Sequence, residues 1–110
     1  MNIRALIRLW EVDGDRTPQI EEVLTEQDLT MHSKQTLTLA AGVQTQINFG
    51  GVTTAELVYI KTDGAVNIHK NHSAEYWEID SVLLVVGCDI TALHAMADAE
   101  TSLEIFVAGS

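Results

Sequence analysis

The chain is poor in cysteine, proline, aromatic residues and basic residues. Because Cys88 is the only cysteine, no disulfide can form within the chain and no metal site can use several thiolates. Its uncharged neighbours Val86 and Gly87 predict a buried thiol that behaves as a small apolar group rather than as a nucleophile. One proline and 7 glycines among 110 residues give no sign of a linker or a disordered segment, so we expect the whole chain to fold.

Basic residues are heavily outnumbered by acidic ones. Six lysines and arginines stand against 16 aspartates and glutamates, which gives a formal net charge of −10. Such a charge repels phosphate backbones and anionic lipid headgroups. We therefore expect neither nucleic acid nor a membrane surface as a partner, whereas binding to a basic surface is permitted.

Long apolar runs are missing as well. The longest, Val82 to Val86, is far too short to cross a bilayer. The N-terminal apolar run is interrupted by Arg4 and Arg8 and has no small-residue cleavage pattern, so it does not predict a signal peptide. We expect the protein to be synthesised in a cytoplasm.

The motifs of common enzymes are also missing. The chain has no Gly-Xaa-Ser-Xaa-Gly elbow, no phosphate-binding loop and no dinucleotide fingerprint. Glu75, Glu78 and Asp80 offer carboxylates of the kind that hydrolyse glycosides, but carboxylates on the wet face of a strand explain them equally well. We expect no catalytic residues, no cofactor and no enzymatic activity.

Short apolar runs with alternating polar residues recur along most of the chain, and each ends at Gly, Asn or Asp. They predict about nine short strands. Two of them lie between residues 37 and 49 and share one buried face around a bend or tight turn at Ala41-Gly42, and the others are at residues 2–12, 55–62, 65–70, 75–80, 82–86, 90–96 and 102–108. With 46% apolar residues, the chain can form one core. The sequence therefore predicts a single all-β domain over residues 1–110, a small antiparallel sandwich of the jelly-roll or Ig-like kind.

Two local patterns predict further elements. Thr17-Pro18 followed by Ile20, Val23 and Leu24 has the cap, the proline and the spacing of a short helix over residues 18–27, with a loop or an edge strand as the alternative. Asp63-Gly64 between two apolar runs predicts a tight β-hairpin.

Two segments carry unusual apolar or aromatic side chains. Val82 to Val86 is apolar on both faces, which predicts either a central strand or a strand with one face covered by another subunit. In Tyr76-Trp77, the parity of Trp77 with Ile79 places Trp77 in the core and leaves Tyr76 as the exposed contact.

Histidines supply the only metal-ligand candidates. His69 and His72 lie three apart in a predicted turn and are weak candidates for a shared ion. Exposed turn histidines are the simpler interpretation, because the sequence offers no obvious third ligand. His94 shares the parity of Ile90 and Met96 in its run, as a partly buried histidine would.

Five segments follow one another in the order Thr36 to Gly42, Phe49 to Val52, Tyr59 to Val66, Val82 to Leu93 and Leu103 to Gly109. In this order they resemble small virion structural proteins of tailed bacteriophages. The resemblance implies a β-sandwich that assembles in many copies on the virion, as a capsid decoration (cement) protein or a minor tail protein. It implies self-association, often as a trimer, and the major capsid protein or tail proteins as partners.

Residues 1–35 depart from this strand pattern, and under the same resemblance they form an N-terminal strand or arm that lies across neighbouring subunits. The candidate interface residues come from the amphipathic N-terminal strand and from the two-faced strand, although an ordinary core would use them as well. They are Ile3, Ile7, Trp10, Val82, Leu84 and Val86.

Two alternative functions stay open. A carbohydrate- or receptor-binding tail module would use Tyr76 and the turn from His69 to His72 to stack on and hydrogen-bond a glycan. A metal-dependent enzyme of the cupin type is the less favoured alternative.

Overall fold

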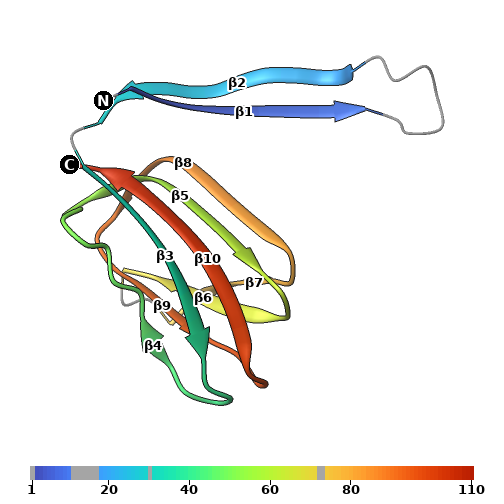
Figure 1. Cartoon of the computed structure of the whole chain (residues 1–110), viewed down its shortest axis with the longest axis vertical. Helices are drawn as coiled ribbons and strands as arrows, with labels where there is room; N and C mark the ends of the chain where they lie inside the picture. The colour runs from blue at the N-terminus through green and yellow to red at the C-terminus, as the bar shows by residue number, and fades with distance from the viewer. Residues whose placement is uncertain (1, 11–17, 30, 72–73) are drawn as a thin grey trace.

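In the computed structural model, residues 2–10, 18–29, 31–71 and 74–110 are described, and within them the chain forms ten β-strands and no helix. The strands are β1 Asn2–Trp10, β2 Pro18–Asp28, β3 Met31–Leu39, β4 Thr45–Gln46, β5 Ala55–Thr62, β6 Val66–Lys70, β7 Tyr76–Ile79, β8 Val82–Ile90, β9 Leu93–Met96 and β10 Thr101–Gly109 (Figure 1). The predicted all-β class is confirmed.

Strands β3 to β10 make two four-stranded sheets. The first has the order β3-β10-β5-β8 and the second the order β4-β9-β6-β7, with every pair antiparallel. Among these eight strands, β6 and β7 are the one consecutive pair that is hydrogen-bonded; every other connection passes from one sheet to the other. This strand order is that of a jelly roll, so the jelly-roll alternative holds and the Ig-like one does not.

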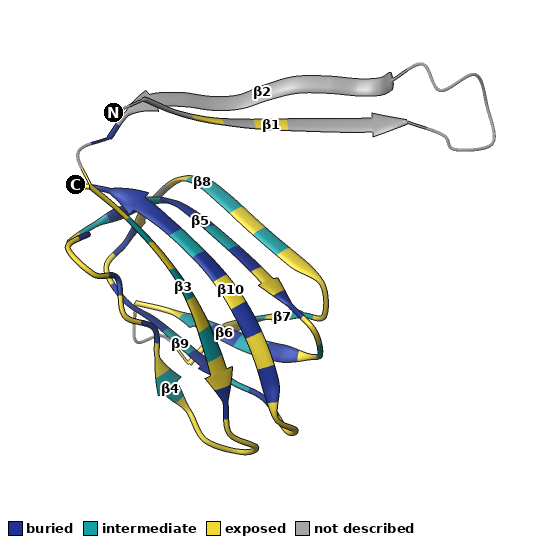
Figure 2. Ribbon diagram, in the orientation of Figure 1, coloured by how far each residue is buried: buried dark blue, intermediate teal, exposed yellow. Residues whose placement is uncertain are grey.

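The core fills the space between the two sheets, and the alternation of side chains along the strands produces it. In β10, the odd-numbered residues from Thr101 to Gly109 are buried, whereas Ser102 and Glu104 are exposed (Figure 2). The core comprises Leu39, Ile47, Phe49, Val52, Ala55, Val58, Ile60, Val66, Ile68, Ile90, Leu93, Ala95, Ala97, Leu103, Ile105 and Val107. Trp77 and Ile79 pack against it, as their parity predicts.

A two-stranded antiparallel hairpin, β1 with β2, precedes the sandwich and extends beyond it (Figure 1). The helix expected over residues 18–27 is therefore wrong. The ladder pairs Ala5 with Thr25 but Leu6 with Val23, so Leu24 is an extra residue at a β-bulge. The bulge breaks the period of two and leaves the apolar residues at a spacing that imitates a helix.

The hairpin expected at Asp63-Gly64 is also wrong, because β5 and β6 belong to different sheets. Residues 63 and 64 carry the chain from the first sheet to the second. The Thr62 hydroxyl donates to Gly64 O at 2.7 Å, and Asp63 Oδ1 accepts from Ser102 N at 2.9 Å. The Asp-Gly pair supplies a tight turn, but the strands that it joins pair with other partners.

A second turn is held by Asn71, which follows β6. Its backbone has a φ of 51°, in the left-handed region that asparagine tolerates better than most residues. Its Oδ1 accepts hydrogen bonds from Thr91 N at 2.7 Å and Ala92 N at 3.3 Å, and its Nδ2 donates to Asp89 O at 3.3 Å. One side chain thereby joins the end of β6 to the β8–β9 connection.

Candidate functional site

The outer face of the first sheet carries a continuous set of apolar side chains, which we call the apolar face. The register places Phe106 opposite Tyr59 and Tyr59 opposite Leu84, in one row across three strands. The neighbouring row holds Ala108, Leu57 and Val86. The apolar face therefore comprises Leu57, Tyr59, Val82, Leu84, Val86, Phe106 and Ala108.

Leu29, between the hairpin and β3, covers one end of the apolar face. It is buried against Leu57 and Ala108, with Val86 and Phe106 packed beside them. At the other end the face stays open to solvent: Val82 is 51% exposed and Leu84 is 37% exposed. Contiguous exposed apolar side chains of this kind mark interaction surfaces in many soluble proteins.

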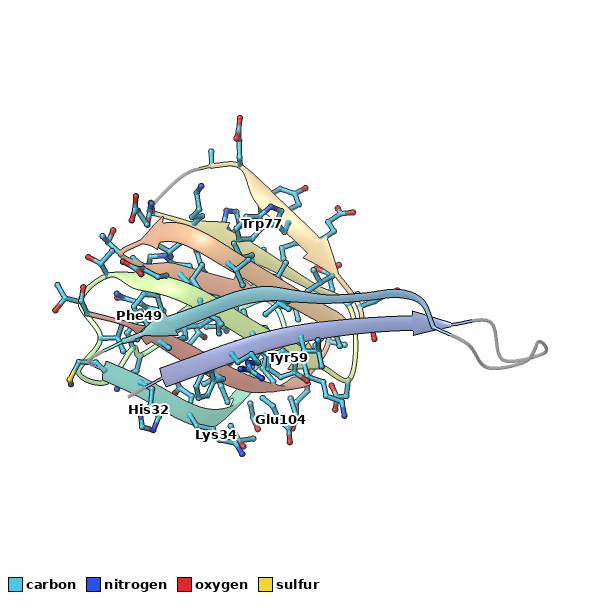
Figure 3. The ribbon with its side chains drawn as sticks, turned by 90° about the horizontal axis from the view of Figure 1, so that it is seen from above. His32, Lys34, Phe49, Tyr59, Trp77 and Glu104 are labelled. Carbon is cyan, nitrogen blue, oxygen red and sulfur yellow. The ribbon has the colours of Figure 1, made fainter. Side chains whose placement is uncertain are left out.

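Polar and charged side chains border the apolar face. Lys34 lies opposite Phe106, and Glu104 lies opposite both Thr36 and Lys61. Lys34 and Glu104 are labelled in Figure 3. At the β3 edge, the His32 ring stacks on Phe106, with 6.0 Å between the ring centroids and 26° between the planes. An apolar centre with a polar rim is the usual anatomy of a protein–protein interface.

The structure separates the six predicted interface residues into three groups. Val82 and Leu84 are exposed on the apolar face. Val86 is partly buried against the group that contains Leu29. Ile3, Ile7 and Trp10 lie on β1, and their side chains are outside the described part of the structure.

β8 lies at the edge of its sheet, so the expectation that Val82 to Val86 forms a central strand is wrong. The jelly-roll order places β10 and β5 at the centre of the sheet, and their pairing depends on contacts between distant segments. Leu83 packs against the core from one face of β8, and Val82 and Leu84 point to the other. The other explanation, that one face of the strand is covered by another subunit, stays a prediction.

The outer face of the second sheet carries a different set of residues, which we call the histidine row. The register aligns Gln46 of β4 with His94 of β9, His94 with His69 of β6, and His69 with Tyr76 of β7. Both histidines are partly buried, whereas Gln46 and Tyr76 are exposed. The His69 and Tyr76 rings are 5.1 Å apart between centroids, tilted by 49°.

The backbone ladder sets the spacing within the histidine row. Asn71 N donates to the directly opposite Ala92 O at 2.9 Å, so the alternation of the ladder makes His69 and His94 a hydrogen-bonded pair as well. The Cα atoms of such a pair are about 5.5 Å apart. On its other side His69 faces Tyr76 in a non-hydrogen-bonded pair, where side chains lie closer, about 4.5 Å between Cα atoms.

A polar cleft of about 430 Å³ adjoins the histidine row. Asn67 precedes His69 by two residues, and Glu78 follows Tyr76 by two, so both share its face. The cleft is lined by Ala65, Val66, Asn67, Glu78, Ile79, Asp80 and Asp98. One aromatic ring beside several hydrogen-bonding side chains suits a polar ligand with a flat apolar face.

The predicted pairing of His69 with His72 is outside what the structure describes, because His72 belongs to the residues that are left out. The residue that the fold brings next to His69 is His94, twenty-five positions along the chain. Neither the pairing of the two histidines nor the position of Gln46 can be read from sequence spacing, because both depend on which strands are neighbours.

The jelly-roll interior holds aliphatic and aromatic side chains rather than ligands for an ion. Within the residues described, no three His, Cys, Asp or Glu side chains come together in a way that could hold a metal. The described ranges likewise contain no helix of a length and apolarity that would span a membrane.

Comparisons with known proteins identify no family. No family model matches the chain, and no curated protein matches it. A cupin domain of Cnp3 from Schizosaccharomyces pombe is similar at 12% identity with a TM-score of 0.43, over 99% of this chain and 84% of that one. A designed double-stranded β-helix is similar at 13% identity with a TM-score of 0.37, over 71% of this chain and 99% of that one. Both likenesses are too low to carry an argument, so the fold assignment rests on strand order.

Proposed function

We propose that this protein is a non-enzymatic structural protein that self-associates through the apolar face, in the manner of a decoration protein on the virion of a tailed bacteriophage. The observation that carries the proposal is the position of Tyr59, Val82 and Leu84 on an outer sheet surface that the chain itself leaves partly uncovered. Exposed apolar area is costly in water and is stabilised by cover from another subunit. The sequence resemblance supplies the virion as the site of assembly.

The β1–β2 hairpin gives a second reason to expect a partner. An isolated two-stranded hairpin is marginally stable in water, because it lacks the third strand or packed face that buries its apolar residues. Among the strands that the structure describes, β1 and β2 are hydrogen-bonded only to each other, outside both sheets, and β2 contacts the sandwich at β8. An arm of this form gains stability from a neighbouring molecule, so it supports assembly in several copies.

Light scattering on the purified protein tests the proposal. We expect the wild type to be oligomeric, and we expect Tyr59→Glu to shift it to the monomer because the charge stands between Phe106 and Leu84. Thr38→Glu is the matched control: Thr38 is exposed on the same sheet, away from the apolar face. A wild type that stays monomeric at every concentration, and that binds neither phage capsids nor tails, would contradict the proposal.

Glycan binding at the histidine row is the second candidate function. It is favoured by Tyr76, which is 49% exposed and packs beside His69. A cleft whose lining includes Asn67 and Glu78, two residues along from His69 and Tyr76, adds hydrogen-bonding side chains on the same sheet. Tyrosine rings stack on the apolar faces of ligands and keep a hydroxyl for hydrogen bonding.

A glycan array with the wild type, followed by titration of any glycan detected, tests this function. Tyr76→Ala should weaken the binding about tenfold, which corresponds to about 1.4 kcal/mol. Tyr59→Ala, on the other sheet, should leave it unchanged. Equal binding by Tyr76→Ala and the wild type would remove the histidine row from consideration as a glycan site.

A further inference from the structure

No described strand pairs with the outer edge of β8, and the β5–β8 ladder shows which backbone groups point toward that edge. Thr62 N donates to Ser81 O at 2.8 Å, and these residues are directly opposite each other in the β5–β8 register. The alternation of an antiparallel ladder then directs the N–H and C=O groups of Leu83 and Val85 toward β5. The corresponding groups of Val82, Leu84 and Val86 point away from β5, toward the open edge.

The β5–β10 ladder gives the same alternation independently. Asp63 N donates to Ser102 O, its opposite residue, at 3.2 Å, so the odd-numbered residues of β5 bond to β10. The even-numbered residues, Val58 and Ile60 among them, are left to bond to β8, opposite Val85 and Leu83. Both ladders agree that every second residue of β8 offers its backbone to a further strand.

β8 also lacks the features that protect sheet edges from pairing with other chains. Natural edges carry charged side chains or proline, or are very short. β3, the other edge of this sheet, contains Lys34, and in the second sheet β4 spans two residues and β7 contains Glu78. The segment from Val82 to Val86 has no charged residue and no proline.

We propose that two copies of this chain pair antiparallel along β8, so that their first sheets join into one continuous eight-stranded sheet. The inference rests on the proposed self-association and adds a backbone contact at the edge next to the apolar face. A two-fold axis at Leu84 places Leu84 opposite its own copy and Val82 opposite Val86 of the second copy. All three positions offer outward backbone groups, so each opposed pair exchanges two hydrogen bonds.

The β8 edge is self-complementary in this register, which is the reason for choosing a second copy as the occupant. An isologous contact needs the same patch on both partners, without like charges face to face. The flanking carboxylates meet this condition: Asp80 comes opposite residue 88, and Asp89 opposite Ile79. Cross-strand pairs among Val82, Leu84 and Val86 bring the exposed ends of the two apolar faces side by side, so each covers the flank of the other.

Gly87 sets the limit of the paired segment. It has a φ of 66°, and the β5–β8 register shifts between Ala55 and Leu57. This irregularity bends β8 after Val86, so a straight partner strand cannot pair beyond that residue. Because the two described sandwich sheets offer one such edge in each chain and the contact is two-fold, pairing closes at two copies and does not propagate into a fibre.

A proline scan of the edge, read by light scattering and analytical ultracentrifugation, tests the proposal. The wild type should have twice the 12.1 kDa mass of one chain. Leu84→Pro removes an N–H that points away from β5, so it should leave the fold intact by circular dichroism and raise the dimer dissociation constant at least about tenfold. Leu84→Ala keeps the N–H and should remain dimeric, as should Thr36→Pro, which removes an outward N–H from the β3 edge.

The outcomes separate this inference from the proposed function. If the wild type associates and Leu84→Pro associates equally, or if the wild type is a trimer, the β8 pairing is wrong while self-association stands. If the wild type is monomeric at every concentration, both are wrong.

Cysteine cross-linking gives a second readout that does not depend on proline being tolerated. In a Cys88→Ser background, Leu84→Cys places two thiols on opposed residues about 5.5 Å apart between Cα atoms, within disulfide range. We expect mild oxidation to link these chains in pairs. Val82→Cys is the matched control. In this register the two copies of residue 82 are offset by four residues along the strands, about 13 Å, which is too far for a disulfide. Equal cross-linking of both variants would overturn the register and the pairing.

Discussion

Replacing Asn71 should reveal how much one side chain contributes to closing the sandwich. Asn71→Ala removes the hydrogen bonds that Asn71 Oδ1 accepts from Thr91 N and Ala92 N and the one that Asn71 Nδ2 donates to Asp89 O. It also places alanine at a φ of 51°. Each hydrogen bond contributes about 0.5–1.5 kcal/mol net, at the low end here because the site is largely exposed. The left-handed backbone adds about 1 kcal/mol for alanine. We expect a loss of about 2–3 kcal/mol.

Two further substitutions separate the causes. Asn71→Gly also loses the hydrogen bonds but accepts the positive φ, so it should cost about 1 kcal/mol less than alanine. Asn71→Asp keeps the acceptor oxygen and loses only the donor to Asp89 O, so it should be the mildest of the three. The predicted order of destabilisation is alanine, glycine, aspartate.

Urea unfolding, followed by circular dichroism, measures these differences directly. For a domain of this size, the alanine variant should also lower Tm by about 10 °C. All variants must be compared at one protein concentration, because self-association adds concentration-dependent stability. An alanine variant within about 0.5 kcal/mol of the wild type would refute the reasoning, since that is the ordinary range for surface substitutions.

Four other substitutions test the packing and the turns of the jelly roll. Gly109→Ala should destabilise the fold by about 3 kcal/mol or more, because the added Cβ would overlap the backbone oxygen of Thr54. Gly42→Ala is the comparison: its added Cβ would meet no atom within 4 Å, so it should cost only about 1 kcal/mol, for the φ of 72°. Ile60→Ala, at a fully buried position, should cost about 2–5 kcal/mol in the same urea assay. Thr62→Val removes the hydrogen bond from the Thr62 hydroxyl to Gly64 O and should lower the free energy of unfolding by about 1 kcal/mol. An unchanged urea midpoint would show that this hydrogen bond does not stabilise the fold.

The sequence predicts the strands well where one face is buried and the other is solvated. The alternation in Ser102 to Ala108 placed Leu103, Ile105 and Val107 inward, and all three are buried in β10. The parity of Trp77 and Tyr76 was equally informative, because one packs on the core and the other is exposed. Such patterns depend only on residues within one strand.

Most of the predictions that failed required knowledge of which strands are neighbours. Asp63-Gly64 has hairpin chemistry, yet its two strands pair elsewhere. The strand from Val82 to Val86 is as apolar as a central strand but lies at an edge. The contact of His69 with His94 depends on β6 and β9 being adjacent, and nothing in the segment from His69 to His72 encodes that. A local bulge at Leu24 was enough to imitate a helix.

The position of β10 has a consequence for how the chain folds. β10 follows all the other described strands in the sequence, yet it lies between β3 and β5 and pairs Met31 with Gly109 and Leu39 with Thr101. During synthesis, β3 therefore has no ladder partner until the segment from Thr101 has left the ribosome. Incomplete chains expose Leu39 and Ile60 together with unpaired strand edges. We expect folding to be slow, in the millisecond-to-second range of non-local β topologies, and nascent chains to depend on chaperones until that last strand inserts.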